Sequence, residues 1–131
     1  MRLTLRKLIK ISFYKALSFI PYFSFFKRTI NSQTPINFTT WFLQKILGFN
    51  RDCYWPVHHS SVVAFPRRIL VGVDVCPGYS NSCNINGENG IAIGDYTQIA
   101  SGVGIQSSNH NLYDLRNQES SSPIKIGSYC W

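Results

Sequence analysis

The sequence predicts a mainly β fold, a parallel β-helix of six-residue repeats preceded by N-terminal α-helices. Isoleucine recurs every six residues between Ile93 and His110, and the first two repeats place a small residue, Thr97 or Val103, four positions after it. One inward aliphatic residue in every six is typical of a chain wound into such a helix. The same spacing occurs more weakly upstream, at Val73, Tyr79, Ile85 and Ile91.

The positive charge of the chain is concentrated at one end. The 131 residues carry a net charge of +7, and nine of the thirteen lysine and arginine residues lie in residues 1–51, which contain no acidic residue. Residues 52–131 contain the other four lysine and arginine residues and all six acidic residues, so they carry a net charge of −2. Such asymmetry indicates one small domain with a basic appendage that meets an anionic surface.

Residues 1–30 are predicted to contain a basic amphipathic helix. Seven of the eight residues on one helical face are apolar, in the set Leu5, Leu8, Ile9, Ser12, Phe13, Ala16, Leu17 and Ile20. Pro21 ends or kinks this helix. Because Lys7, Lys10 and Lys15 interrupt the apolar run, a transmembrane span is disfavoured. The helix can lie in a membrane interface, or it can pack on the chain's own β domain or on a partner subunit.

The lack of a convincing secretory signal predicts a cytoplasmic protein, and the basic helix predicts that it can contact the inner face of the cytoplasmic membrane peripherally through residues 1–30. Nucleic acid is not an expected partner, because no groove-reading motif accompanies the charge. The cysteines lack close CxxC spacing, which indicates reduced thiols at Cys53, Cys76, Cys83 and Cys130. A second short helix is expected over residues 39–47, with Trp41, Phe42 and Ile46 on one face.

The expected organisation is a helical segment, residues 1–54, followed by a repeat domain, residues 55–131. The six-residue phase slips over residues 86–90, where glycine and asparagine suit a tight corner because both tolerate positive φ. The period is lost again over residues 111–123 and returns at Ile126. This polar stretch is predicted to leave the repeats as a loop, and loops on a rigid scaffold are where function concentrates.

Several motifs in residues 55–131 resemble a known family. They are Ile93-Gly94-Asp95-Tyr96-Thr97, Ile99-Ala100, Asn109-His110-Asn111-Leu112-Tyr113-Asp114, and Pro123-Ile124-Lys125-Ile126-Gly127 with Cys130-Trp131. In this combination the chain resembles the hexapeptide-repeat acyltransferases with left-handed β-helices, within which it is most similar to sugar and antibiotic O-acetyltransferases and to serine-acetyltransferase-like proteins.

The resemblance implies an acetyl-CoA-dependent O-acetyltransferase acting on the hydroxyl of a sugar or similar acceptor, in surface-polysaccharide biosynthesis for example. It implies a homotrimer with acetyl-CoA as co-substrate held between subunits, and no metal. His110 opens the loop at the position of the general base, a role that suits imidazole because its ordinary pKa of about 6.5 leaves it able to accept a proton. The implied substrate-binding residues are Asn84, Asn86, Asn109 and Trp131.

Three alternatives stay open at this point. His110 can be a loop histidine without a role, or, with His58 and His59, part of a zinc site, although their spacing does not match that of β-helical carbonic anhydrases. Once the loop is removed, residues 69–131 leave fewer than three coils of about 18 residues each, so the chain is expected to be a C-terminally truncated family member. The alternative function is a non-catalytic, shortened protein that only associates with homologous subunits.

Overall fold

The computed structural model describes residues 5–17, 26, 29, 31–111, 113–114, 116, 118–119 and 121–131. The chain divides into two compact units, residues 1–38 and 39–131. The first unit contains α1 (Leu5–Leu17), which confirms the predicted N-terminal helix; Pro21 lies outside the described residues. Leu5, Ile9 and Phe13 of α1 are exposed apolar side chains. Within the described residues, no helix has the length and apolar character needed to cross a bilayer.

The second predicted helix is present, but half of it is a π-helical turn. It consists of α3 (Phe38–Trp41) and the π-helix η2 (Phe42–Ile46). Trp41 is buried, whereas Phe42 and Ile46 are exposed, so the prediction that these three share one face is wrong. The reason is that Gln44, 2 % exposed, takes the inward position instead.

Gln44 organises the segment that leads into the sheets. Its Nε2 donates to the carbonyl oxygens of Asn50, Cys53 and Trp55 at 3.2, 3.4 and 2.9 Å, and its Oε1 accepts from the Val57 N–H at 3.3 Å. A buried amide without partners would be costly, so these four contacts make its burial tolerable. The polar side chain thereby fixes an irregular backbone that has no strand partner of its own.

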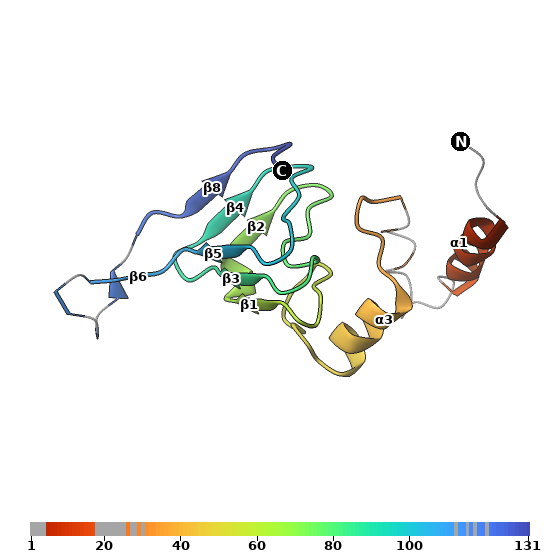
Figure 1. Ribbon diagram of the computed structural model, residues 1–131, viewed down its shortest axis with the longest axis horizontal. Coiled ribbons are helices and arrows are strands. Elements are labelled where there is room, and N and C mark those ends of the chain that lie inside the picture. Colours follow the sequence, from red (N-terminus) through yellow and green to blue (C-terminus); the bar gives the residue numbers. More distant parts are fainter. Residues whose placement is uncertain are drawn as a thin grey trace. The chain divides into compact units, whose positions relative to one another are not determined.

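Six short strands form two parallel sheets (Figure 1). The first sheet has the order β1 (Val62–Ala64), β3 (Asn84–Asn86), β5 (Gly104–Gln106). The second has the order β2 (Ile69–Val71), β4 (Ile91–Ile93), β8 (Ile124–Ile126). The chain therefore alternates between the sheets, and a 3₁₀ turn, η3 (Pro66–Arg68), joins β1 to β2.

Aliphatic side chains from both sheets build one core. Val63, Ile85 and Ile105 are in register across the first sheet, and Ile85 is fully buried. In the second sheet both ends of each strand contribute, as the buried Ile91 and Ile93 show. Full burial of such a side chain stabilises the fold by about 1.5–3 kcal/mol, so this cluster is the main source of stability in the second unit.

The predicted left-handed parallel β-helix is wrong for this structure. The strands form two separate, open sheets of three, and the described residues form no closed or coiled sheet. The six-residue period marks many of the inward aliphatic positions, such as Ile85, Ile91 and Ile105, but it does not make every repeat a strand. The chain turns through left-handed φ values of 56°, 57° and 59° at Asp74, Tyr96 and Tyr129, and residues 97–100 have no strand pairing.

One turn follows each strand of the second sheet, and two glycines allow these turns to stack on one another. A Cβ at Gly72 would lie 2.6 Å from the backbone nitrogen of Asp95, and one at Gly94 would lie 2.6 Å from that of Ser128. Side chains reinforce the stack: the Asp95 carboxylate accepts from the Val73 N–H at 2.7 Å, and Tyr96 stacks on Tyr129 at 5.3 Å. The third turn, at Gly127, has only the Cys130 Sγ within 4 Å, at 3.6 Å.

Candidate functional site

A short antiparallel hairpin carries His110. After β5 the chain forms β6 (Asn109–His110), which pairs with β7 (Gln118–Glu119) in the register Asn109↔Glu119 and His110↔Gln118. The hairpin extends beyond the end of the two sheets (Figure 1). Asn109 and His110 are both exposed. The structure therefore places His110 where the sequence predicted a loop to begin.

Asn89 and Ser107 hold the base of this hairpin. Ser107 is 4 % exposed; its Oγ donates to the Asn86 carbonyl at 2.9 Å and accepts from the Asn89 N–H at 2.9 Å. The Asn89 Nδ2 donates to the carbonyls of Ser107 and Glu119 at 2.8 and 3.4 Å, and so joins both arms of the hairpin to the β3–β4 turn. Ser121 adds a further bond from its Oγ to the Ser107 carbonyl at 3.0 Å.

Asn86 is already engaged within the chain. Its Oδ1 accepts from the Glu88 N–H at 3.0 Å, and its Nδ2 donates to the Ser108 Oγ at 3.0 Å. The side chain thus shapes the β3–β4 turn and supports the residues just before β6. Asn84 lies on the same outward face of β3, because the two flank the inward Ile85, and its side chain is exposed. Binding of an acceptor by either asparagine stays a prediction.

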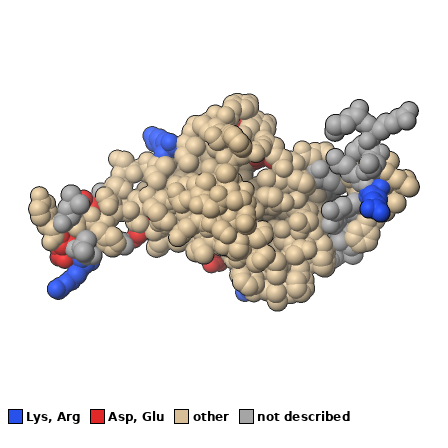
Figure 2. Space-filling model, viewed as in Figure 1, with Lys and Arg blue, Asp and Glu red and all other residues tan. Residues whose placement is uncertain are grey.

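The hairpin loop is ordered by Asn111. Its Oδ1 accepts from the backbone N–H groups of Tyr113 and Asp114 at 2.8 and 3.1 Å, while its Nδ2 donates to the Glu119 Oε1 at 2.7 Å. Both acidic and basic side chains gather on this loop (Figure 2). Tyr113 is 98 % exposed. The site is therefore a polar, solvent-facing loop with one imidazole at its origin.

Trp131 is not brought to the hairpin. It follows the third stacked turn, where the Cys130 N–H donates to the Thr97 Oγ1 at 3.2 Å, and it is 97 % exposed. Figure 1 shows the C-terminus beyond one end of β8 and the β6–β7 hairpin beyond the other. Within one copy of this chain, Trp131 and His110 therefore do not form one site.

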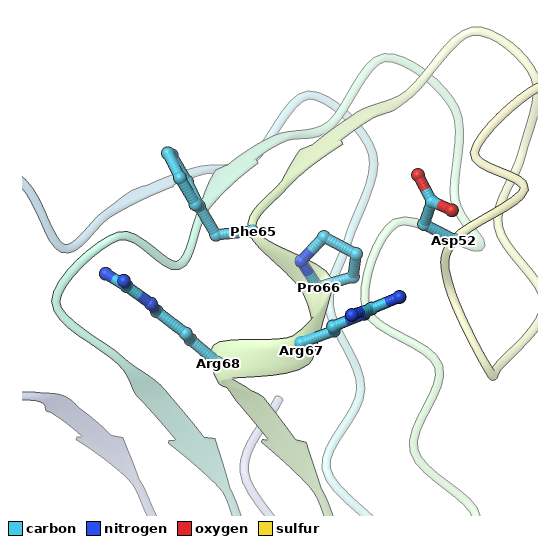
Figure 3. A pocket seen from close by; sticks show the side chains of 5 residues that line it. All are labelled: Asp52, Phe65, Pro66, Arg67 and Arg68. Carbon is cyan, nitrogen blue, oxygen red and sulfur yellow. The ribbon is translucent and has the colours of Figure 1, made fainter.

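A separate hollow of about 290 Å³ lies beside the 3₁₀ turn, lined by Asp52, Phe65, Pro66, Arg67 and Arg68 (Figure 3). The Arg68 guanidinium lies 5.6 Å from the centre of the Phe65 ring and donates to the Glu88 carbonyl. Phe65 has a left-handed φ of 54°, an uncommon conformation for a bulky residue. Figure 3 shows the two arginine side chains extending from the turn in different directions. None of the predicted site residues lines this hollow.

The other two histidines lie at the start of the β region, before β1. Burial, and to a smaller extent the neighbouring His59, lower the pKa of His58 below its ordinary value of 6.5. The His58 Nδ1 is within 2.8 Å of the Ser60 Oγ, and the two imidazole rings lie 4.2 Å apart. Among the residues that the structure describes, no three His, Cys, Asp or Glu side chains are grouped so as to hold a metal ion.

Asn89, Ser107 and Asn111 are the supporting residues that sequence reasoning missed. The only sequence signal was an asparagine and glycine cluster before β4, which predicts a corner but not which later residues it would bind. Comparison with known protein families, with curated proteins and with solved structures found no match to this chain.

Proposed function

We propose that this chain is an O-acetyltransferase that moves an acetyl group from acetyl-CoA to a hydroxyl of a sugar or similar acceptor, with His110 as the general base. The observation that carries the proposal is the position of His110, exposed at the origin of a hairpin whose base is braced by Asn89 and Ser107. A general base must be accessible to its substrate, and this arrangement offers an exposed imidazole on a backbone that is fixed at its base.

The reaction needs one base and one site for developing negative charge. The neutral imidazole of His110 takes the proton from the acceptor hydroxyl as its oxygen attacks the thioester carbonyl carbon. The tetrahedral intermediate collapses with cleavage of the carbon–sulfur bond, and the imidazolium returns the proton to the leaving thiolate. A backbone N–H near the thioester would stabilise the oxyanion. Asn84 and Asn109 offer amide groups to the acceptor's other hydroxyls.

The proposal includes an assembly and a location. Acetyl-CoA would bind between the subunits of a homotrimer, in which Trp131 of a neighbouring subunit can approach the acceptor. The basic residues 1–30 would contact the inner face of the cytoplasmic membrane, where a lipid-linked precursor of a surface polysaccharide is a suitable acceptor. The exposed apolar side chains of α1 support that contact.

A non-catalytic role is the second candidate. In the sheet orders observed for the described strands, β5 and β8 are edge strands, and an edge strand presents unpaired backbone groups to another chain. This observation favours a protein that only associates with homologous subunits, through these edges. On that hypothesis His110 has no chemical role.

The deciding experiment is thioester cleavage by the full chain, with acetyl-CoA and a panel of sugars and serine, followed as release of free CoA thiol. The His110→Ala variant should lower kcat about 100-fold or more, the usual contribution of a general base. His59→Ala is the matched control, because His59 is also exposed but lies before β1. Equal rates for wild type and His110→Ala would remove His110 from the mechanism, and no cleavage with any acceptor would favour the non-catalytic role.

A further inference from the structure

The helix η2 presents an inverted face to solvent. It buries the polar Gln44 and exposes Phe42 and Ile46, which are 38 and 43 % exposed. The following residues continue the exposed apolar surface, with Leu47 at 55 % and Phe49 at 46 %. A buried amide opposite an exposed aromatic and aliphatic cluster is the reverse of an ordinary surface helix. We call Phe42, Ile46, Leu47 and Phe49 the η2 patch.

The inversion is built into the fold. Three bonds from the Gln44 Nε2 and one to its Oε1 hold that side chain inward, so the helix cannot rotate the patch into the core without breaking all four. The backbone after the helix is equally fixed, because the Phe49 N–H donates to the Leu43 carbonyl at 3.1 Å. The patch therefore cannot turn into the core of its own unit, and exposed apolar groups that lie close together in this way mark interaction sites.

The charges around the patch identify what it fits. Lys45 lies within it in sequence, and the Arg51 guanidinium lies close to Gly48, where a Cβ would be 3.0 Å from its Nη2. Residues 1–51 contain no acidic residue. The nearest acidic residue, Asp52, is exposed and follows Arg51 directly, so residues 42–52 carry a net charge of +1. Aromatic and aliphatic side chains beside an excess of cations match the boundary between acyl chains and anionic headgroups.

We propose that the η2 patch is a membrane-contact surface that inserts Phe42 and Phe49 into the interface of an anionic bilayer. This contact belongs to the unit that carries the sheets, and it is distinct from any contact made by residues 1–30. It does not depend on the proposed enzymatic function. The partner that this patch binds is the lipid surface itself, and no soluble protein partner is needed.

The test is co-sedimentation of the full chain with phosphatidylcholine vesicles made with and without phosphatidylglycerol. The double variant Phe42→Ser/Phe49→Ser should bind the anionic vesicles about tenfold more weakly than wild type, since two aromatic side chains no longer insert. Leu70→Ser is the matched control, because Leu70 is an equally apolar and more exposed side chain, 68 %, on the outer side of β2. That control should bind like wild type.

Three results would overturn the proposal. Binding of the double variant equal to that of wild type would show that the patch makes no contact, whatever residues 1–30 do. An equal loss in Leu70→Ser would show a general effect of lost surface apolarity. Self-association of the wild type without vesicles, abolished in the double variant and detected by light scattering, would assign the patch to a second copy instead. Circular dichroism of each variant verifies that it is folded.

Discussion

The two parallel sheets and the β6–β7 hairpin are held together by different kinds of contact. The sheets are stabilised by backbone pairing and by buried aliphatic side chains such as Ile85 and Ile91, and few polar side chains take part. The hairpin has only two residues in each strand, and its base depends on amide and hydroxyl side chains, above all Asn89 and Ser107.

Because of this difference, the core residues determine the stability of the second unit, whereas the polar residues at the hairpin base determine the geometry of the candidate site. Loss of a core aliphatic side chain is expected to destabilise the whole second unit. Loss of one polar contact at the hairpin base removes about 0.5–1.5 kcal/mol and acts locally, because the sheets do not depend on it. The residues that hold His110 can therefore be changed while the scaffold stays folded, which makes the candidate site testable.

The largest effect is expected within the stacked turns. Gly94→Ala places a Cβ 2.6 Å from the Ser128 backbone nitrogen, and backbone on both sides cannot yield cheaply. We expect a loss of about 3 kcal/mol in the free energy of unfolding, measured by urea denaturation followed by circular dichroism. Gly127→Ala is the matched control at the equivalent position of the third turn, and it should cost about 0.5 kcal/mol or less. Equal losses in the two variants would show that the turns are not stacked as described.

A smaller effect is expected in the core at alkaline pH. Burial, with a lesser contribution from Asp52, raises the pKa of the Cys53 thiol from 9.0 to about 11, whereas Lys45 opposes this slightly. Because the folded-state pKa lies above the unfolded value, this contribution to stability is complete below pH 9 and is lost as the pH rises towards 11. The total loss stays below about 3 kcal/mol, because one pKa unit corresponds to about 1.36 kcal/mol.

The measurement compares wild type with Cys53→Ala across this pH range by urea denaturation. The difference between their unfolding free energies should shrink as the thiol ionises in the unfolded chain. Comparison of the two proteins at each pH removes the contribution of Tyr79, whose pKa is also raised, chiefly by burial. A difference that does not change between pH 9 and 11 would contradict a buried, neutral Cys53.

Part of this structure could be predicted from the sequence because part of it depends on local periodicity. The six-residue spacing identified Ile85, Ile91 and Ile105 as inward, and all three are buried. The same spacing also pointed to Val73, which is wrong, because that side chain is 60 % exposed. It did not predict the sheets correctly, because pairing is decided by contacts far along the chain: β4 pairs with β8 across the whole hairpin segment. The left-handed positions Asp74 and Tyr96 are not glycines, so the sequence contained no signal for these turns.

The candidate site divides in the same way. The loop after His110 was predictable, because loss of the period and a run of polar residues are local signals. Asn89 was not, because an asparagine before a glycine indicates only a turn, whereas its partners Ser107 and Glu119 lie 18 and 30 residues away. Long-range polar contacts leave no periodic trace in a single sequence.

The smallest global effect, and the sharpest test of the comparison, is expected from Asn89→Ala. The variant removes both Nδ2 bonds that join the arms of the hairpin to the β3–β4 turn, while the backbone N–H of residue 89 can still bind Ser107. Amides of residues 107–119 should exchange hydrogen about five- to thirtyfold faster, corresponding to about 1–2 kcal/mol of local stability, while those of β3 and β4 keep their protection. Asn81→Ala, in an exposed turn before β3, is the control and should leave the hairpin amides unchanged. If exchange in Asn89→Ala rises equally in the sheets and in the hairpin, the two regions form one cooperative unit, and His110 is then positioned by the global fold rather than by a local polar brace.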